Sequence, residues 1–437
     1  MGCFGFSRKD KAKQKKKPSS MASTTAKKEP VSKPPAKSAS IAQRWRDLSG
    51  QSHWNGLLEP LDLDLRQYIV HYGEMVQAAY DTFNSCTESQ YAGSSIYSRQ
   101  DFFSKVGIVN GNPYCKYQVT KFLYATSEAR MPGAFMVFPA SGQGWTKQSN
   151  WIGYVAVATN DGTAVLGRRD IVVAWRGTIE TTEWIDDFDF GLVDGSKIFA
   201  GKSKPIKVHR GWLSIYTSYD TRSKFNKICA RDQLLQEISR LVELYKDEDI
   251  SITVCGHSLG AALATLSATD IVFNGYNKPK GRPDKACPVT AFPFACPRVG
   301  ASDFKNLFSG LDNLRALRTK NLPDVVCAYP MVGYSDVGDE LAIDTRKSPY
   351  LKSPGNVTTF HSMEHYMHGV AGTHGTKGEF RLEINRDISL VNKNTDSLKD
   401  EHMVPDHWRV LKNKGMVQQG DGSWKLMDHE PDDGDGQ

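Results

Sequence analysis

Long apolar runs are missing from this 437-residue sequence, and none is long enough to cross a lipid bilayer. The first residues contain no apolar stretch of the kind found in secretory signals, so we expect no secretory signal. The eight cysteines are scattered without paired spacing, which favours free thiols in a reducing compartment. Neither a C-x-x-C pair nor a P-loop sequence is present. The sequence therefore argues against a membrane-spanning protein, a disulfide-stabilised secreted domain and a P-loop nucleotide hydrolase.

Acidic residues are scarce in residues 1–40, which hold eleven Lys or Arg and two acidic residues. This tail therefore carries +9, and because the whole chain carries +6, the remainder carries −3. The basic character belongs to the tail, so no nucleic-acid partner is expected for the folded part. Lys, Ser, Thr, Ala and Pro dominate the tail, which cannot bury enough apolar surface to offset its ordering entropy. We predict that residues 1–40 are a disordered polybasic tail.

The start of the tail suggests a membrane anchor. Gly2 is in position for a myristoyl group and Cys3 for a palmitoyl group, and the lysines that follow would supply a second membrane signal. The acylation pattern expects Ser or Thr at the sixth position, where this chain has Phe6, so an unmodified soluble tail remains the alternative. We expect a cytoplasmic protein in peripheral contact with a membrane. A plastid transit peptide is less favoured because lysine dominates.

The sequence Gly256-His-Ser-Leu-Gly260 lies between a predicted buried strand and a predicted helix. G-x-S-x-G in this context is the nucleophile elbow of α/β-hydrolases. Glycines on both sides of Ser258 remove the Cβ atoms that would collide in so tight a turn. The helix N-terminus points at the reacting centre, and the backbone N–H of Leu259 falls where an oxyanion would form. An inert serine in a glycine-rich turn is the less favoured interpretation.

The rest of the chain predicts one large α/β domain over residues 41–426, followed by an acidic disordered C-terminus at residues 427–437. Apolar spacing predicts helices at residues 65–83, 213–225 and 231–245. Apolar runs predict strands at residues 151–158, 170–175, 289–294 and 314–319. A turn is expected at residues 160–162, and irregular loops with short helices at residues 84–150.

An acid and a base follow the elbow in the order that α/β-hydrolases use. A serine hydroxyl is a weak nucleophile until a base takes its proton, and that base is usually a histidine held by a carboxylate. Asp324 lies just past a predicted strand end, where active-site loops gather, although a helix-cap or turn role is the alternative. His361 is the preferred base because it opens a helix-like segment, whereas His365 and His368 are expected on the helix face or at the surface.

Thr178 follows the predicted strand at residues 170–175 in the sequence Trp-Arg-Gly-Thr. Its backbone N–H is predicted to be the second oxyanion donor, beside that of Leu259. Residues 182–190 mix aromatic and acidic side chains. Two interpretations stay open for them: a small mobile lid over an apolar acyl site, or an ordinary surface helix.

The same histidines allow a different interpretation. The sequence His361-Ser-Met-Glu364-His365 matches H-x-x-E-H, an inverted zinc-protease motif in which Glu364 would be the base. A third ligand would be needed, and no glutamate further along the chain lies in a convincing pattern. Because a serine triad is already present in order, the zinc protease is the remote alternative and no metal is expected.

Five motifs together carry a resemblance: Trp175-Arg-Gly-Thr178, Val208-His-Arg-Gly-Trp212, Gly256-His-Ser-Leu-Gly260, Cys296-Pro-Arg-Val-Gly300 and Asn321-Leu-Pro-Asp324. The chain resembles the class 3 lipases, and more closely the plant phospholipase A1 branch, the acylhydrolases named for defective anther dehiscence. The similarity covers about residues 44–426 and resembles the class II, non-plastid members. This chain has Val326-Cys327 where the family usually has Val-Pro.

The resemblance implies an α/β-hydrolase fold, with a mostly parallel central sheet flanked by helices and a short lid. It implies hydrolysis of the sn-1 acyl ester of glycerophospholipids, without a metal or an organic cofactor and with membrane phospholipid as the substrate. Ser258 would be the nucleophile, and Asp324 and His361 would complete the triad. Thr178 and Leu259 would form the oxyanion hole.

Three other functions stay open. A broader lipid esterase would act on galactolipids or on mono- and triacylglycerols, a choice made by pocket shape that the sequence does not show. A catalytically silent lipid-binding protein would keep the fold and leave Ser258 unused. The zinc protease is the third. The sequence gives no indication of the oligomeric state.

Overall fold

The structure of the chain is a computed structural model that describes residues 41–129, 136–140, 149–178, 190–409 and 415–432. The predicted tail with Gly2 and Cys3, the predicted lid apart from Phe190, and the last five residues lie outside the described residues. No helix in the described ranges is long and apolar enough to cross a membrane.

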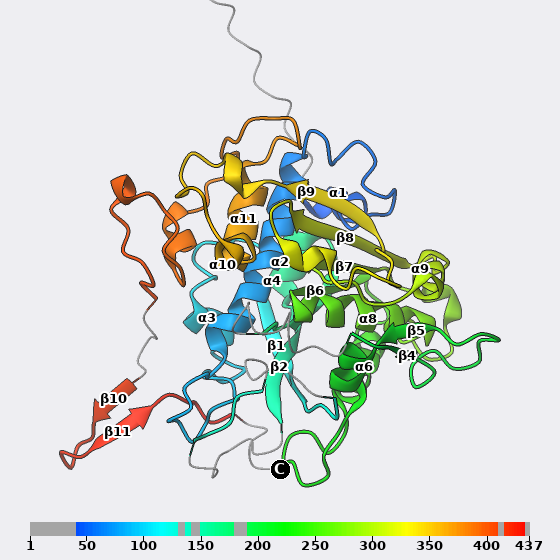
Figure 1. The fold of residues 1–437 in the computed structure, drawn as a ribbon. Coiled ribbons are helices and arrows are strands. Elements are labelled where there is room, and N and C mark those ends of the chain that lie inside the picture. The colour runs from blue at the N-terminus through cyan, green and yellow to red at the C-terminus, as the bar shows by residue number, and fades with distance from the viewer. Residues whose placement is uncertain (1–40, 130–135, 141–148, 179–189, 410–414, 433–437) are drawn as a thin grey trace, which may run out of the picture. The chain divides into compact units, whose positions relative to one another are not determined.

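A seven-stranded sheet forms the centre of the described part, in the order β1-β2-β3-β6-β7-β8-β9 (Figure 1). The strands are β1 (Tyr117–Ala125), β2 (Asn150–Ala158), β3 (Arg169–Trp175), β6 (Ile250–His257), β7 (Val289–Phe294), β8 (Leu314–Asn321) and β9 (Asp339–Ile343). From β3 to β9 neighbouring strands pair in parallel, whereas β1-β2 and β2-β3 pair antiparallel. The predicted mostly parallel sheet is confirmed. In the described ranges, two small antiparallel pairs lie outside it: β4 (Leu192–Asp194) with β5 (Lys207–His209), and β10 (Gly415–Gln418) with β11 (Trp424–Met427).

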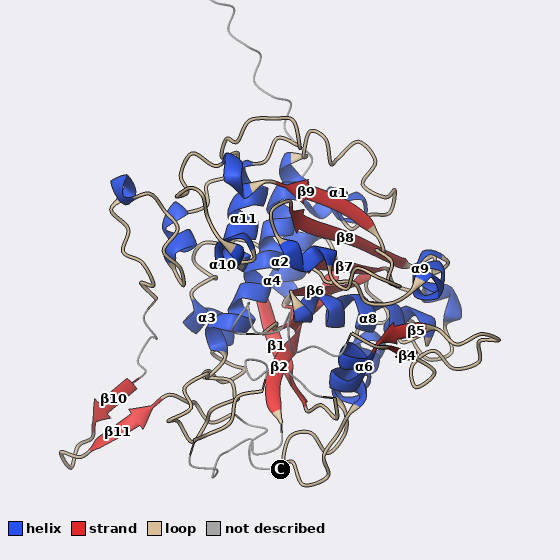
Figure 2. Ribbon diagram, viewed as in Figure 1, coloured by secondary structure: helices blue, strands red, loops and turns tan. Residues whose placement is uncertain are grey.

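Helices cover both faces of this sheet (Figure 2). One face is packed by α2 (Leu63–Thr82) and α11 (Met363–Gly372), and the other by α7 (Ala230–Leu244) and α8 (Leu259–Phe273). Among the described residues, the remaining helices of four or more residues are α1 (Ile41–Leu48), α3 (Phe102–Val106), α4 (Asn160–Leu166), α6 (Arg210–Thr217), α9 (Ser302–Ser309), α10 (Val357–Phe360) and the 3₁₀ helices η2 (Val325–Ala328) and η4 (Ile388–Asn392).

The sequence of β3 shows why the sheet is covered on both sides. Ile171 and Val173 point into the core cluster that contains α7 and α8, and Val172 and Ala174 point into the cluster that contains α2 and α11. Every residue of β3 is buried. Successive strand side chains alternate between faces, so a strand covered on both faces reads as a continuous apolar run.

Several local expectations are wrong. Residues 160–166 form α4 instead of a tight turn, because the Thr159 hydroxyl accepts the Gly162 N–H and caps a helix. β1 lies in a segment expected to be loops, since its polar residues weaken the apolar pattern. α6 ends at Thr217 rather than at residue 225, and β9 was not expected.

Residues 428–432 belong to the predicted acidic C-terminus and make side-chain contacts with the N-terminal half of the described part. Asp432 pairs with Arg99 at 2.5 Å, and Glu430 pairs with Lys105. The Asp428 carboxylate accepts from Asn84 Nδ2 at 3.2 Å. The acidic side chains find basic and amide partners that the sequence places more than 300 residues away.

Candidate active site

Ser258 stands on the turn between β6 and α8. Its φ of 58° and ψ of −127° put it in a region that a residue with a side chain rarely occupies. A Cβ on Gly256 would lie 2.2 Å from the Gly260 carbonyl oxygen, and one on Gly260 would lie 2.4 Å from the Trp175 carbonyl oxygen. Only glycine fits at either place, so the predicted strand–turn–helix elbow is confirmed.

Asp324 and His361 meet although 37 residues separate them. Asp324 follows β8 and caps η2, where its Oδ1 accepts the Val326 N–H at 3.0 Å. Its Oδ2 accepts the His361 Nδ1–H at 2.7 Å, and both side chains are buried. A carboxylate bound to Nδ1 fixes the ring orientation and leaves Nε2 free to accept a proton.

Three polar atoms at this site are buried without a hydrogen-bond partner among the described residues: Ser258 Oγ, His361 Nε2 and His257 Nε2. Buried polar groups normally form hydrogen bonds. Unpaired atoms on the elbow serine and on the histidine that would be its base therefore indicate a place for a reacting group. The ring of His257 lies 4.7 Å from that of His361, and its Nδ1 is hydrogen-bonded to the Tyr80 hydroxyl at 2.8 Å. Burial and the neighbouring His361 lower the pKa of His257 well below its usual value, which keeps His257 neutral.

The backbone around Ser258 brings the two predicted oxyanion donors into the same region. Leu259 is the first residue of α8, where N–H groups have no acceptor within the helix. A Cβ on Gly177 would lie 3.3 Å from the Ser258 Cβ and 2.6 Å from the His257 carbonyl oxygen. The glycine therefore lets the Thr178 loop approach the elbow, and Thr178 is buried.

A cavity of about 350 Å³ opens beside these groups. Its walls include Thr178, His257 and His361, together with residues from the end of α2, from α10 and from the segment after η4. The volume lies in the range of small-molecule sites.

A tyrosine that the sequence analysis missed supports the Asp–His pair. The Tyr366 hydroxyl donates to Asp324 Oδ2 at 2.6 Å, and it accepts the Asn321 N–H at 3.1 Å. Asn321 Nδ2 in turn donates to the Phe360 carbonyl oxygen at 2.9 Å, which holds the residue before His361. The only sequence signal for Tyr366 is that a tyrosine buried on a helix needs a partner for its hydroxyl.

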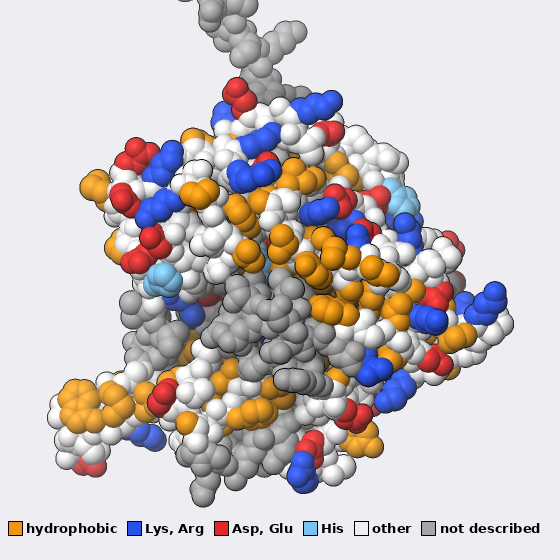
Figure 3. All heavy atoms as spheres, in the orientation of Figure 1, with side chains coloured by type: hydrophobic (Ala, Val, Ile, Leu, Met, Phe, Trp, Pro, Cys, Tyr) orange, Lys and Arg blue, Asp and Glu red, His pale blue; other side chains and the backbone are white. Residues whose placement is uncertain are grey.

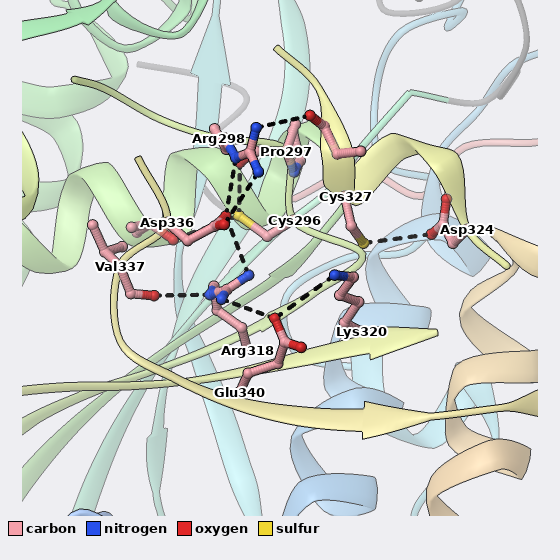
Figure 4. Close-up of polar contacts among 12 residues, drawn as sticks. Cys296, Pro297, Arg298, Arg318, Lys320, Asp324, Cys327, Asp336, Val337 and Glu340 are labelled. Atoms are coloured by element: carbon pink, nitrogen blue, oxygen red, sulfur yellow. Dashed lines mark hydrogen bonds and ion pairs between the residues drawn. The ribbon is translucent and has the colours of Figure 1, made fainter. Parts of the chain in front are cut away.

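Ion pairs tie down the loop that carries Asp324 (Figure 4). Arg298 donates to the carbonyl oxygens of Ala328 and Pro330, and it pairs with Asp336 at 3.3 Å. Arg318 pairs with the same Asp336 at 3.4 Å and joins it to β8. The Pro-Arg-Val-Gly motif therefore contributes a structural clamp.

Cys327 occupies the place where the resembled family usually has proline, and η2 forms all the same. Its thiol donates weakly to Asp324 Oδ2 at 3.8 Å (Figure 4). Burial is the main cause that raises the pKa of Cys327 well above its usual value, so the thiol stays protonated.

The H-x-x-E-H pattern does not converge on one point. His361 faces Asp324, whereas Glu364 pairs with Arg386 and Lys393. Among the residues that the structure describes, no three His, Cys, Asp or Glu side chains are grouped to hold a metal. The zinc-protease alternative therefore has no ligand set in this geometry.

His365 and His368 lie on a helix, α11, which was one of the two expected places, but neither is at the surface, because both are buried. Burial lowers the pKa of His365 to about 3. Burial, together with the neighbouring His365, lowers that of His368 to about 3. Both are neutral at physiological pH and contribute to packing.

These two histidines predict a loss of stability in acid. Their pKa values are depressed on folding, so the unfolded chain takes up protons from about pH 6.5 downward and the folded chain does so only near pH 3. The stability that they contribute is present above pH 6.5 and is lost as pH falls from 6.5 to 3. By pH 4.5 each should cost roughly 2–3 kcal/mol of unfolding free energy. Urea unfolding at pH 7 and 4.5 measures the change.

His365→Gln should flatten that pH dependence, because one of the two buried bases is removed. His407→Gln is the matched control, since the His407 side chain is exposed. Equal pH slopes for wild type and His365→Gln would contradict the assignment.

Tyr366→Phe should lower kcat about 10-fold, because one charge-assisted hydrogen bond to the Asp324 carboxylate is lost. The unshielded carboxylate would hold a protonated imidazole more strongly, so the acid limb of the pH–rate profile should move to higher pH. A purely structural tyrosine would change stability and leave that limb in place. Tyr219→Phe, an exposed tyrosine, is the control.

The sheet, the elbow and the acid–base order define an α/β-hydrolase. A family model described as Lipase (class 3) matches residues 172–334. The chain is 66% identical over 395 residues to phospholipase A1-IIgamma of Arabidopsis thaliana, covering 90% of this chain and 94% of that protein. It is 56% identical over 394 residues to phospholipase A1-II 1 of Oryza sativa subsp. indica, covering 90% and 98%.

The chain belongs to the plant phospholipase A1 class II family within the class 3 lipases. The solved structure of Lip2 lipase from Yarrowia lipolytica aligns with 65% of this chain and 81% of its own, at 18% identity and a TM-score of 0.42.

Proposed function

We propose that this chain is a phospholipase A1, a serine acylhydrolase that releases the sn-1 acyl chain of glycerophospholipids. The observation that carries the proposal is the elbow serine beside a buried, carboxylate-bound histidine. Ser258 Oγ and His361 Nε2 both lack a hydrogen-bond partner among the described residues. The relatives that share more than half of its residues are named phospholipases A1. These relatives support a phospholipid as the substrate, which the geometry alone does not identify.

In this mechanism His361 Nε2 takes the proton of Ser258 while Ser258 Oγ attacks the acyl carbonyl carbon. The Leu259 and Thr178 N–H groups hold the oxyanion that forms. His361 then returns the proton to the departing glycerol oxygen, and the ester bond breaks to leave an acyl-enzyme. Water, activated by the same histidine, hydrolyses the acyl-enzyme and releases the fatty acid.

A substrate panel tests this choice against a broader lipid esterase. Initial rates would be measured on phosphatidylcholine, monogalactosyldiacylglycerol, monoacylglycerol and triacylglycerol with the same acyl chains in the same micelles. The proposal expects the highest kcat/KM on the phospholipid. A higher value on galactolipid or on a neutral glyceride would keep the mechanism and replace the substrate.

Peripheral contact with a membrane is a second part of the proposal. Exposed apolar side chains flank the segments that carry Asp324 and His361: Leu322, Val325, Met331, Val332 and Val357. Val332 is 87% exposed and Met331 65% exposed. Hydrophobic side chains also gather on the face of the molecule that Figure 3 shows, in the area where β7 and β8 are labelled in Figure 1. An apolar rim around a lipid-hydrolysing site fits a lipid surface.

The polybasic tail would add attraction to anionic lipid, with or without acylation of Gly2 and Cys3, and would favour a cytoplasmic, membrane-associated location. Deletion of residues 1–40 should weaken binding to phosphatidylserine-containing vesicles and leave the rate on neutral micelles unchanged. Unchanged vesicle binding would contradict this part of the proposal.

A further inference from the structure

The cavity beside His361 has a wall that the mechanism above does not use. His361 must protonate the departing glycerol oxygen, so the alcohol part of the substrate lies against this residue. The lining of the cavity includes apolar and aromatic side chains, Tyr80, Phe83 and Met363, and beside them a set of polar ones, Gln77, Asp81, Ser85, Thr358, Asn394, Thr395 and Arg409. A polar headgroup would find hydrogen-bond donors among this polar set.

Arg409 is the cation that this cavity offers. It belongs to a charge network in which Arg386 pairs with Glu364, and Lys393 pairs with Asp81. The side chains of Arg386 and Lys393 are only 7% and 10% exposed, and that of Arg409 is 21% exposed. The buried cations Arg386 and Lys393 are therefore paired with buried carboxylates, and Arg409 is the cation at the cavity surface.

The contacts of Arg409 leave part of its guanidinium open. Nη2 donates to the backbone carbonyl oxygen of Asp81, and Nε lies 3.5 Å from Asp81 Oδ1. Within the described ranges, Nη1 has no acceptor. Asp81 Oδ1 also accepts from Gln77 Nε2 at 3.0 Å, and Oδ2 pairs with Lys393. Lys393 thus compensates the negative charge of Asp81, which limits the repulsion between this carboxylate and an incoming anion.

We propose that this cavity binds the phosphodiester of a glycerophospholipid headgroup, with Arg409 facing the phosphate. Thr358 and Asn394 are exposed and supply neutral donors at the same wall. A guanidinium presents paired N–H groups that match two phosphate oxygens. The inference rests on the proposed phospholipase activity and adds the residue that separates phospholipid from neutral glyceride.

The first test compares Arg409→Gln with wild type on phosphatidylcholine and on diacylglycerol with the same acyl chains, in the same detergent micelles. kcat/KM on the phospholipid should fall ~10- to 100-fold, because a charge-assisted contact is lost, and should change less than about twofold on diacylglycerol. Arg409→Lys should recover part of the loss. Arg381→Gln, an exposed arginine, is the matched control and should change neither rate.

An equal fall on both lipids, or no fall on either, would overturn the proposal. Activity that persists in Ser258→Ala would instead refute the serine mechanism, so the two failures are distinguishable. The second test needs no lipid: sn-glycero-3-phosphocholine should competitively inhibit hydrolysis of p-nitrophenyl butyrate by wild type, and glycerol should not. Arg409→Gln should raise the inhibition constant ~10-fold or more. Absence of inhibition, or an equal constant in the variant, would overturn the headgroup site.

Discussion

Ser258→Ala is expected to lower kcat on phosphatidylcholine by about 10⁴- to 10⁶-fold, because the acyl-enzyme can no longer form. Alanine keeps the Cβ that the turn already accommodates, so the fold should persist. Labelling by a fluorophosphonate probe should disappear together with activity. Ser423→Ala, an exposed serine in the turn before β11, is the matched control and should keep both.

A loss of kcat smaller than about 10⁴-fold in Ser258→Ala would mean that another group attacks the ester. Probe labelling that survives the substitution would point to a different serine. Either result would contradict the role of the elbow, whatever the substrate.

Asp324→Asn is expected to lower kcat about 10⁴-fold, the size of loss seen when a triad carboxylate becomes an amide. The amide no longer offers Nδ1 of His361 a charged acceptor, and it forces one hydrogen-bond partner of Oδ2 to turn away. Circular dichroism checks that η2 and β8 remain folded. Asp312→Asn, an exposed aspartate with no ion pair among the described residues, is the control.

A loss smaller than about 10-fold would show that Asp324 caps η2 and does not orient the base. That was the alternative left open by the sequence, and the geometry gives Asp324 both contacts.

The elbow was predictable because its cause is local. The glycines flanking Ser258, the strand that leads to the turn and the helix that follows it all lie between Ile250 and Phe273, and the close approach at Gly256 and Gly260 follows from the turn itself. The pairing of Asp324 with His361 was predictable from chain order and strand ends, which fix where loops gather on a parallel sheet.

Other features depend on contacts that no short stretch encodes. Tyr366 reaches Asp324 only after α11 packs against β8, and Arg409 reaches the cavity only through its contact with Asp81. Acidic residues of the segment 428–432 find their partners near residues 84–105. Periodicity reports which face of an element is buried and does not report which polar atoms meet across the core.

The central claim is hydrolysis at the sn-1 ester by Ser258, and the most direct measurement uses phosphatidylcholine with different, isotopically distinguishable acyl chains at sn-1 and sn-2. Wild type and Ser258→Ala would be run side by side, and the released fatty acids would be identified by mass spectrometry. We predict release of the sn-1 chain by wild type and no release by the variant. Release of the sn-2 chain first, or equal release by the variant, would contradict the account.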